Sequence, residues 1–271
     1  MRAGIVGLGH VGRAMRSFLG QNNGEIVCYD EALDDRYPED DLAKCDFVAV
    51  CVDTPMLPDG TCDTSKVESA VRRVPNQLLL LKSTVAPTTT DRLVALTDKQ
   101  ICFSPEFIGQ PTYCDPGLPT RVEHIPYVIL GGAPATRHTF AELLVPLLGP
   151  LKTYFQCSAL EAEIIKYMEN SFLATKVSFV NEFFEICKAF DADWHTVREG
   201  WLLDPRVGRS HSAVFTPARG FSGKCLVKDV SAIVRAADEA GYGAALLAEV
   251  LKSNERFRAD ESDGTGVTQE P

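Results

Sequence analysis

Residues 2–12, with the sequence RAGIVGLGHVG, determine which fold this chain adopts. Their first half is a short apolar run that predicts a strand, and their second half is a G-x-G-x-x-G turn that leads into a predicted helix over Gly12–Leu19. In such a turn Gly7 allows the tight bend, Gly9 lets a pyrophosphate approach the backbone, and Gly12 lets the helix pack closely on the strand. The segment therefore predicts the first unit of a sheet that binds a dinucleotide.

A carboxylate follows at the position where such a site needs one. The predicted second strand, Glu25–Tyr29, ends at Asp30, which lies 18 residues after the last glycine of the turn and could bind the ribose hydroxyls of an adenosine. His10 and Val11 of the same turn would also contact the cofactor, and the N-terminus of the helix that follows faces phosphates with a partial positive charge. Because Asp30 and Glu31 would repel a 2′-phosphate, NAD is favoured over NADP. The alternatives are a glycine-rich turn that binds nothing and an ordinary solvated carboxylate.

Strands and helices alternate through the first half of the chain. Phe47–Val52 is an unbroken apolar run, typical of a strand that is buried on both faces, and Gln77–Lys82 predicts another. Repeated strand–helix units predict an α/β fold, a Rossmann-type doubly wound parallel sheet. Further strands are expected at Gln100–Phe103, Tyr127–Leu130 and Thr153–Gln156, with helices at Ser65–Arg73, Thr89–Leu96, Ala135–Leu148, Val227–Ala240 and Ala244–Phe257.

The pattern becomes helical near Ser158, with one stretch free of Gly and Pro from Ala159 to about Phe190. We therefore expect an NAD-binding Rossmann domain over residues 1–157 and an all-helical domain over residues 158–258. Residues 259–271 have low hydrophobicity and no periodicity, which predicts a disordered tail.

The composition limits what the chain can bind and where it functions. With 271 residues, 45% of them hydrophobic, the chain is long enough to bury a core. Its net charge is −10 and it has no block of Lys and Arg, so nucleic acid and anionic membranes are poor partners. No apolar run is long enough to cross a bilayer and no leader precedes the first strand, so we expect a cytoplasmic protein. The nine cysteines show no metal-like pairs, which predicts reduced thiols and no metal site.

One of the nine cysteines has a setting that favours nucleophilic chemistry. Residues 220–229, GFSGKCLVKD, form a glycine-containing loop that leads into a predicted helix, so Cys225 lies near the helix N-terminus. The helix dipole and the flanking Lys224 and Lys228 favour the thiolate, which is the reactive form. Asp229 follows four residues later and could orient a water molecule or hold a lysine. Cys225 is therefore the candidate nucleophile, although most cysteines serve as small core residues.

Lys166 and Asn170 form a second candidate pair. They lie four residues apart in the long helical stretch, so they share one face and could both donate to a developing oxyanion. On spacing alone, a solvent-facing lysine and an incidental asparagine explain the pair better, because such pairs are common on exposed helix faces.

Six motifs, taken in order, resemble those of the UDP-glucose/GDP-mannose dehydrogenase family and extend over nearly the whole chain to about residue 258. They are the glycine turn at 7–12, Val52–Pro55 with Asp59–Gly60, the KSTVAP segment Lys82–Pro87, the SPEF segment Ser104–Phe107, the Lys166/Asn170 pair, and residues 220–229. Each motif alone is weak, but several motifs in the family's order are specific.

The resemblance implies an NAD-dependent dehydrogenase that oxidises a primary alcohol of a nucleotide sugar, UDP-glucose or a similar compound, to a carboxylate. A first hydride transfer gives an aldehyde, Cys225 attacks it to form a thiohemiacetal, and a second transfer gives a thioester that water hydrolyses. The resemblance also implies roles for the other catalytic residues. Lys166 and Asn170 would stabilise the oxyanion, Glu106 would act as general base or acid, Asp229 would assist through water or Lys166, and Thr84 would lie beside the nicotinamide.

Binding residues and a partner follow from the same resemblance. Thr54, Thr84 and Lys228 would join the glycine turn in contacting NAD. Substrate contacts would come from Glu106, Lys166, Asn170, Phe221 and Cys225, and from Arg206, which resembles an arginine that can reach the neighbouring subunit. Because the helical domain of the family forms a dimer, we expect a homodimer through the helical domain of this chain.

The chain also departs from the family. The family's second loop glycine is Ser222 here and its proline is Val227, Lys224 adds a charge beside the nucleophile, and a glutamate that often follows PEF is Gln110. The family carries a further α/β domain after the long dimer helix, and that domain binds much of the nucleotide. We therefore expect a short form that lacks the C-terminal nucleotide-binding domain. The catalytic residues are present in this form, but the sequence does not identify the substrate.

Two other functions remain as alternatives. One is a two-electron β-hydroxyacid-type dehydrogenase of a small substrate, because related enzymes share the fold and a Lys-x-x-x-Asn pair but do not need the cysteine. The other is a non-catalytic NAD-binding protein that acts with a partner. The motif around Cys225 favours the four-electron enzyme over the first alternative, and the presence of every catalytic residue type argues against the second.

Overall fold

The structure is a computed structural model, and it describes residues 1–22, 24–109, 119–216, 218–223 and 225–259. Contacts divide these residues into two units, which are described separately: the first extends to Lys166 and the second starts at Tyr167. Helix α6 (Ala159–Ala189) contributes residues to both units. The domain boundaries expected from the sequence stay predictions. Gln110, Lys224 and residues 260–271 of the predicted tail lie outside the described residues.

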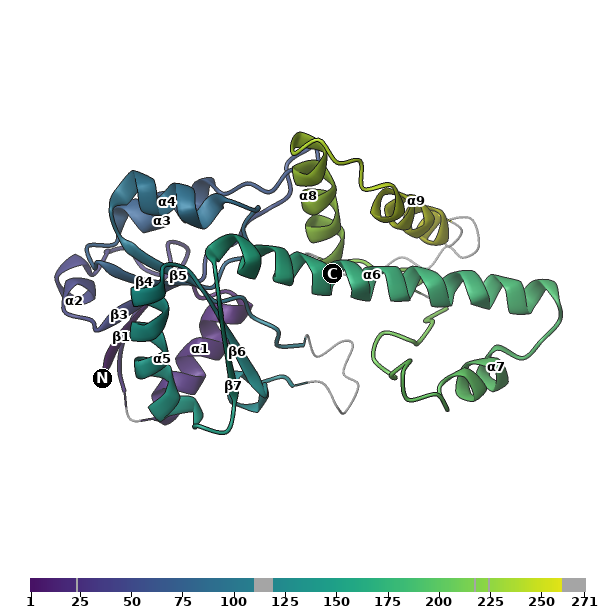
Figure 1. Ribbon diagram of the computed structural model, residues 1–271, viewed down its shortest axis with the longest axis horizontal. Helices are drawn as coiled ribbons and strands as arrows, with labels where there is room; N and C mark the ends of the chain where they lie inside the picture. Colours follow the sequence, from purple (N-terminus) through teal and green to yellow (C-terminus); the bar gives the residue numbers. More distant parts are fainter. Residues whose placement is uncertain (23, 110–118, 217, 224, 260–271) are drawn as a thin grey trace. The chain divides into compact units, whose positions relative to one another are not determined.

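The first unit is built on a seven-stranded sheet with the strand order β2-β1-β3-β4-β5-β6-β7. Figure 1 shows this sheet together with the helices of the unit. The strands are β1 (Arg2–Val6), β2 (Glu25–Tyr29), β3 (Phe47–Val50), β4 (Leu78–Leu81), β5 (Gln100–Phe103), β6 (Tyr127–Gly131) and β7 (Thr153–Cys157). Neighbouring strands are parallel except β5 and β6, which pair antiparallel with Phe103 opposite Gly131. The Rossmann-type fold is confirmed, and its sheet is mostly parallel. The sequence did not predict the one antiparallel pair, because an apolar run does not encode strand direction.

Helices pack on both faces of this sheet, which explains its unbroken apolar strands. Val48 and Leu79 face a cluster that includes buried side chains of α2, α3 and α4. Phe47 and Leu80, one residue along each strand, face a cluster that includes buried side chains of α1 and α5. Full burial of such a side chain is worth roughly 1.5–3 kcal/mol, so both faces stabilise the sheet. The helices of this unit are α1 (His10–Gln21), α2 (Glu39–Ala43), α3 (Ser65–Arg73), α4 (Thr89–Thr97), η2 (Val122–His124) and α5 (Pro134–Leu148).

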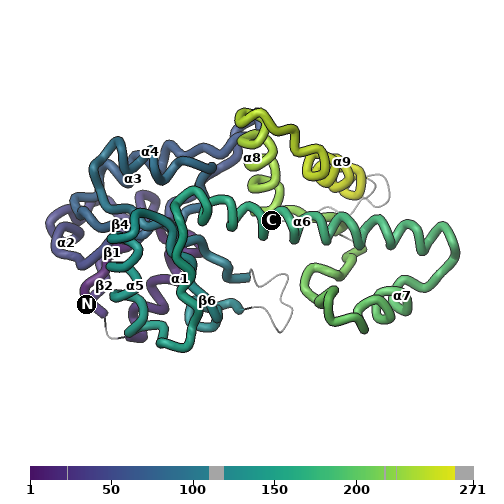
Figure 2. The backbone as a smooth tube through the Cα atoms, viewed as in Figure 1, coloured from purple at the N-terminus to yellow at the C-terminus, as the bar shows by residue number. Residues whose placement is uncertain are grey.

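The second unit is helical, as predicted. It contains most of α6, which is one uninterrupted helix (Figure 2), together with α7 (Trp194–Trp201), α8 (Leu226–Glu239) and α9 (Ala245–Ala259). One core cluster joins Ala174 and Val177 of α6 with Val230 of α8 and Val250 of α9. A smaller cluster packs Trp194 of α7 against Val180 and Cys187 of α6.

Most predicted elements form within one or two residues of their expected ends. The sequence did not predict α2, η2 and α7, which are short. The side chain of Asp193 caps α7 by accepting a hydrogen bond from the Thr196 N–H at 2.8 Å. Within the described part of the chain, no helix is both long and apolar enough to cross a membrane.

Candidate functional site

The first unit gathers five of the predicted site residues along one edge of its sheet. Gly7, Asp30, Thr54, Thr84 and Glu106 follow the ends of β1, β2, β3, β4 and β5 in that order. These five strands are mutually parallel, so their carboxyl ends meet at the same edge. In open α/β sheets this edge is where ligands bind, beside the point at which the strand order reverses. Here the reversal lies between the neighbouring strands β1 and β3.

The glycine turn has the geometry that a phosphate site requires. Gly7 has φ +92°, and a Cβ there would lie 2.7 Å from the backbone carbon of Cys51. A Cβ on Gly12 would overlap with the carbonyl oxygen of Gly7. A Cβ on Gly9, in contrast, would meet no atom within 4 Å, and Gly9 is the N-cap of α1. The turn therefore leaves open space at the N-terminus of α1, next to His10 and Val11, and this arrangement fits a pyrophosphate.

Asp30 is held beside the turn as a carboxylate. Its Oδ2 accepts a hydrogen bond from the Leu8 N–H at 2.6 Å, and its Oδ1 accepts one from the Ala32 N–H at 3.0 Å. These two backbone hydrogen bonds hold the pKa of Asp30 below its usual value. The side chain is thereby fixed next to the glycine turn in the ionised state, which is the form that accepts hydrogen bonds from ribose hydroxyls.

The loops after β3 and β4 are joined to each other by side-chain hydroxyls. Thr54 is buried, and its hydroxyl donates to the carbonyl oxygen of Thr84 at 2.7 Å. Ser83 donates to the carbonyl oxygen of Val52 at 2.6 Å. Thr54 and Thr84 thus lie next to each other in the structure, and their contacts with NAD stay predictions.

Glu106 lies in a buried charged cluster of the first unit. Its Oε2 is 3.2 Å from Nζ of Lys82, and its Oε1 accepts a hydrogen bond from the Phe107 N–H at 2.9 Å. The ammonium group of Lys166 lies 4.6 Å from the centre of the Phe107 ring, a cation–π distance. Lys82, Glu106 and Phe107 also line a cavity together with Tyr127. Lys82 belongs to the KSTVAP segment, but the sequence alone assigns it no role, because its burial beside Glu106 becomes visible only in the structure.

The second unit brings Asn170 together with Lys228 and Asp229 in the first turn of α8, which follows Cys225. Asp229 is 1% exposed, its Oδ2 accepts a hydrogen bond from Asn170 Nδ2 at 2.5 Å, and its Oδ1 pairs with Nζ of Lys228. Cys225 is the N-cap of α8, and its carbonyl oxygen accepts a hydrogen bond from the Asp229 N–H at 2.9 Å. The structure therefore places Cys225 at a helix N-terminus with the Asn170–Asp229 pair one turn further along the helix.

Cys225 differs from the other described cysteines in exposure. It is the one exposed thiol of the eight cysteines that the structure describes. Burial raises the pKa of Cys51 and Cys102 to about 12 and raises the pKa of Cys157 to a smaller extent. Such buried thiols are inert, whereas an exposed thiol at a helix N-terminus can form the thiolate. Across the described part of the chain, no group of His, Cys, Asp or Glu is arranged to hold a metal ion.

The structure gives the surroundings of Phe221 and Arg206, the two remaining residues that are predicted to bind substrate. The ring of Phe221 is buried in the core of the second unit, and its backbone N–H and carbonyl are hydrogen-bonded to Asn254. Arg206 is almost fully exposed and pairs with Asp204 at 2.6 Å. Their contacts with substrate stay predictions.

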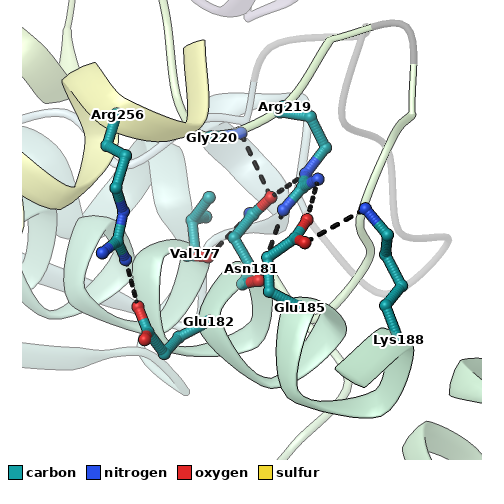
Figure 3. Close-up of polar contacts among 8 residues, drawn as sticks. All are labelled: Val177, Asn181, Glu182, Glu185, Lys188, Arg219, Gly220 and Arg256. Atoms are coloured by element: carbon teal, nitrogen blue, oxygen red, sulfur yellow. Dashed lines mark hydrogen bonds and ion pairs between the residues drawn. The ribbon is translucent and has the colours of Figure 1, made fainter. Parts of the chain in front are cut away.

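Three buried polar residues around the cysteine loop were missed. Arg219 directly precedes the loop, and it contacts Asn181 of α6 (Figure 3), while Asn254 of α9 bonds to Phe221. For Asn181 and Asn254, the sequence does contain a signal: each asparagine occupies a position on the buried face of its helix, where an apolar residue is usual.

The glycine turn, the carboxylate after β2 and the mostly parallel sheet define a Rossmann-type dinucleotide-binding protein. Residues 35–117 match the UDP-glucose/GDP-mannose dehydrogenase family, NAD binding domain, and residues 160–256 match the central domain of the same family. The chain belongs to this family, which confirms the resemblance and NAD as the cofactor.

Individual proteins that are similar to this chain agree with this assignment. The UDP-glucose 6-dehydrogenase AglM of Haloferax volcanii is 33% identical over 80% of this chain and 54% of that protein. The UDP-glucose 6-dehydrogenase YwqF of Bacillus subtilis is 30% identical over 82% of this chain and 51% of that protein. The structure of a UDP-glucose dehydrogenase from Pyrobaculum islandicum superposes with a TM-score of 0.79 at 26% identity and covers 94% of this chain and 68% of that one. The chain spans about half the length of the curated relatives it matches.

Proposed function

We propose that this protein is an NAD-dependent dehydrogenase that oxidises a primary alcohol of a nucleotide sugar, UDP-glucose or a similar compound, to a carboxylate. The observation that carries the proposal is Cys225, the exposed thiol at the N-terminus of α8, followed by Lys228 and Asp229 in the first turn. Membership of a family of NAD-binding dehydrogenases supports the reaction class. The names of the relatives support the substrate class.

NAD bound at the glycine turn supplies the hydride acceptor for both oxidations. The substrate alcohol loses a proton and a hydride to become an aldehyde, and the sulfur of Cys225 adds to the aldehyde carbon. Loss of a second hydride from the resulting thiohemiacetal leaves a thioester. Water then attacks the thioester carbon, and the C–S bond breaks to release the carboxylate and restore the thiolate. Four electrons leave the carbon in total, which corresponds to two NADH for each acid.

The chain's own residues would stabilise the charges that develop in these steps. Lys166 and Asn170 would donate hydrogen bonds to the oxyanion, and the Asn170–Asp229 hydrogen bond fixes the orientation of that amide. Glu106, with Lys82 as its counter-charge, would take the proton from the hydrolytic water. At the N-terminus of α8, the helix dipole favours the thiolate of Cys225 both as nucleophile and as leaving group.

The Cys225→Ser variant tests the covalent mechanism. We expect acid formation to fall by roughly 10³-fold or more, because a serine hydroxyl without an activating base is a poor nucleophile. NAD affinity, measured by calorimetry, should not change, because Cys225 is not among the residues expected to contact NAD. The matched control is Cys28→Ser, which replaces a half-buried thiol of β2 and should retain acid formation. A wild-type rate of acid formation in Cys225→Ser would contradict the mechanism.

The ratio of NADH to acid separates this function from its alternatives. A panel of nucleotide sugars, free sugars and small hydroxy acids is incubated with NAD, and NADH and products are quantified. The proposal predicts two NADH for each acid. A reaction that stops at an aldehyde or ketone with one NADH would indicate the two-electron β-hydroxyacid type. NAD binding without turnover across the panel would indicate a non-catalytic NAD-binding protein that acts with a partner.

We also propose a homodimer that forms through α6. Several large apolar side chains are exposed along this helix in the second unit: Met168, Phe172, Phe179 and Phe183. They recur at intervals of four and seven residues, which places them on one face of the helix. A second copy of the chain presents the same stripe, and two such stripes can pack on each other around a twofold axis.

A further inference from the structure

The loop that carries Cys225 is attached to α6 by a buried asparagine. Asn181 is 1% exposed, and its Oδ1 accepts a hydrogen bond from Arg219 Nε at 2.7 Å and another from the Gly220 N–H at 3.4 Å (Figure 3). Its Nδ2 donates to the carbonyl oxygen of Val177 at 2.8 Å, one turn earlier in α6. Every polar atom of this amide is therefore bonded, and its oxygen fixes the start of the loop.

Arg219 is anchored by several groups around its guanidinium. Nη1 donates to Glu185 Oε1 at 2.6 Å, and Nη2 donates to the carbonyl oxygen of Asn181 at 3.3 Å (Figure 3). The rings of Phe184 and Phe257 lie 4.6 Å and 5.4 Å from the guanidinium carbon. A buried charge needs an ion pair and hydrogen bonds of this kind. Their presence fixes the orientation of the residue that precedes the loop.

Asn254 of α9 holds the next part of the loop. This side chain is 3% exposed; its Oδ1 accepts a hydrogen bond from the Phe221 N–H at 2.6 Å, and its Nδ2 donates to the Phe221 carbonyl oxygen at 2.9 Å. Gly220 has φ +69°, and a Cβ there would overlap with Asn254 Oδ1. The glycine is therefore required both by its backbone conformation and by the close approach of this amide.

We infer that Asn181 and Asn254 are positioning residues for Cys225: they hold the start of its loop so that the thiol stays at the N-terminus of α8. Only three residues separate Phe221 from Cys225, which is itself the N-cap of α8. The loop is short and held at both ends. The inference rests on the proposed function for its catalytic meaning, but the placement of the thiol can be measured without turnover.

An amide is the side chain that suits this role. It presents one acceptor and two donors, so a single Asn can satisfy both the N–H and the carbonyl of one backbone residue. Asn254 bonds to Phe221 in this way. A carboxylate keeps the acceptor but loses the donor, and alanine loses both. Asn254→Asp and Asn254→Ala therefore remove the contacts in two stages.

The rate of Cys225 alkylation by iodoacetamide, measured from pH 6 to 10 and located by peptide mass spectrometry, reports the setting of the thiol. We expect Asn254→Ala to lower the rate at pH 7 roughly 3- to 10-fold and to move its pH profile upward, because a released loop leaves the helix N-terminus that favours the thiolate. Because Cys225 is already exposed, release of the loop should make the thiol little more accessible to iodoacetamide. The alkylation rate of the Asn254→Asp variant should lie between those of the wild type and the Asn254→Ala variant. Cys28 in the same sample serves as the internal reference, and Glu255→Ala, an exposed change on α9, serves as the control.

Turnover provides the second readout. Acid formation by Asn254→Ala should fall roughly 10- to 100-fold, the effect of a small misplacement of a reacting group, while NAD affinity by calorimetry stays within about twofold of wild type. Far-UV circular dichroism checks that each variant is folded, and if Asn254→Ala is not, Asn254→Asp and Gly220→Ala test the same contact. A folded variant with the wild-type alkylation rate and pH profile would overturn the inference. Acid formation at the wild-type rate by Cys225→Ser would instead overturn the proposed function, and the alkylation profile would still decide the role of Asn254.

Discussion

Asp30 makes two hydrogen bonds to the backbone around the glycine turn and still has acceptor capacity for the ribose of NAD. We expect Asp30→Ala to weaken NAD binding roughly 10- to 100-fold, because hydrogen bonds to a charged group are worth about 1.5–3 kcal/mol. Calorimetric titration with NAD measures this change. Part of the effect comes from the glycine turn, since the Leu8 N–H loses its partner in the variant.

The matched control for this prediction is Asp35→Ala, which removes the same charge from an exposed position in the segment that follows β2. It should bind NAD with wild-type affinity. Equal affinities for wild type and Asp30→Ala would remove Asp30 from the cofactor site. A matching loss in Asp35→Ala would mean that the overall acidity of this segment, rather than the Asp30 side chain, sets the affinity.

Site residues could be predicted from the sequence where a short local pattern places a reactive or charged side chain at the end of a strand or at the start of a helix. Cys225 at a helix N-terminus and Asp30 after a strand follow from local patterns, and the structure places both residues there. The bonds of Asn181 and Asn254 span 38 and 33 residues, to Arg219 and to Phe221. No local pattern encodes contacts over such separations, so these two residues could not be assigned from the sequence. Lys82 was missed for a similar reason, because its partner Glu106 lies on the neighbouring β-strand connection.

At the scale of elements, the start of α4 depends on a carboxylate from another helix. Glu163 of α6 is fully buried, and its Oε2 accepts a hydrogen bond from the Thr88 N–H at 2.7 Å. Its Oε1 accepts from both the N–H and the hydroxyl of Thr90, at 2.8 Å and 2.6 Å. The side chain of Thr88, the N-cap of α4, makes no capping bond. Glu163 therefore satisfies the first amides of α4 in its place.

This contact predicts a pH-dependent contribution to stability. Burial raises the pKa of Glu163 to about 7, against the lowering effect of its hydrogen bonds from Thr90 and Thr88. Between the ordinary carboxyl pKa, near 4.5, and about 7, the folded chain binds a proton that the unfolded chain lacks. The contribution is therefore fully present below about pH 4.5 and is lost as the pH rises through about 7.

Glu163→Gln removes this titration and also sets an amide donor against one of the backbone N–H groups. We expect the free energy of unfolding in urea to fall by about 1–3 kcal/mol at pH 8. The difference from wild type should be larger at pH 5 than at pH 8 by on the order of 1–3 kcal/mol. Glu142→Gln, an exposed change on α5, serves as the control. A difference from wild type that is the same at both pH values would show that Glu163 does not titrate in this range.

Most elements could be predicted because their sequence periods are long or their apolar runs unbroken. The β3 and β4 strands are apolar at successive positions, since both faces of the sheet are covered. Helix α2 has only five residues, too few to show a helical period. The antiparallel pairing of β5 and β6 could not be predicted, because neither strand sequence carries its direction.

At the scale of the whole molecule, the exposed stripe on α6 predicts association. Met168 and Phe172 are 73% and 63% exposed, while the rings of Phe179 and Phe183 contact each other in a tilted arrangement with their centres 4.7 Å apart. We expect sedimentation analysis at micromolar concentration to show a dimer. Phe172→Glu should raise the dimer dissociation constant roughly 100-fold or more, because it buries two like charges across a twofold axis.

Leu151→Glu is the control for the dimer prediction. It makes the same kind of change at a fully exposed leucine of the first unit, and it should leave the sedimentation behaviour unchanged. A monomeric wild-type protein at these concentrations would contradict the proposed homodimer. Dissociation caused equally by Leu151→Glu would mean that added negative charge, rather than the α6 stripe, controls association.

The two buried asparagines of α6 also constrain how this helix can change in length. Asn170 and Asn181 are eleven residues apart, which is close to three full helical turns, so both project from the same side. An insertion or deletion of one residue between them would rotate one relative to the other by about 100°. Substitutions on the outer side of this segment leave that alignment intact. The segment between Asn170 and Asn181 can therefore diverge in sequence, but its length is fixed by the two bonds to Asp229 and Arg219.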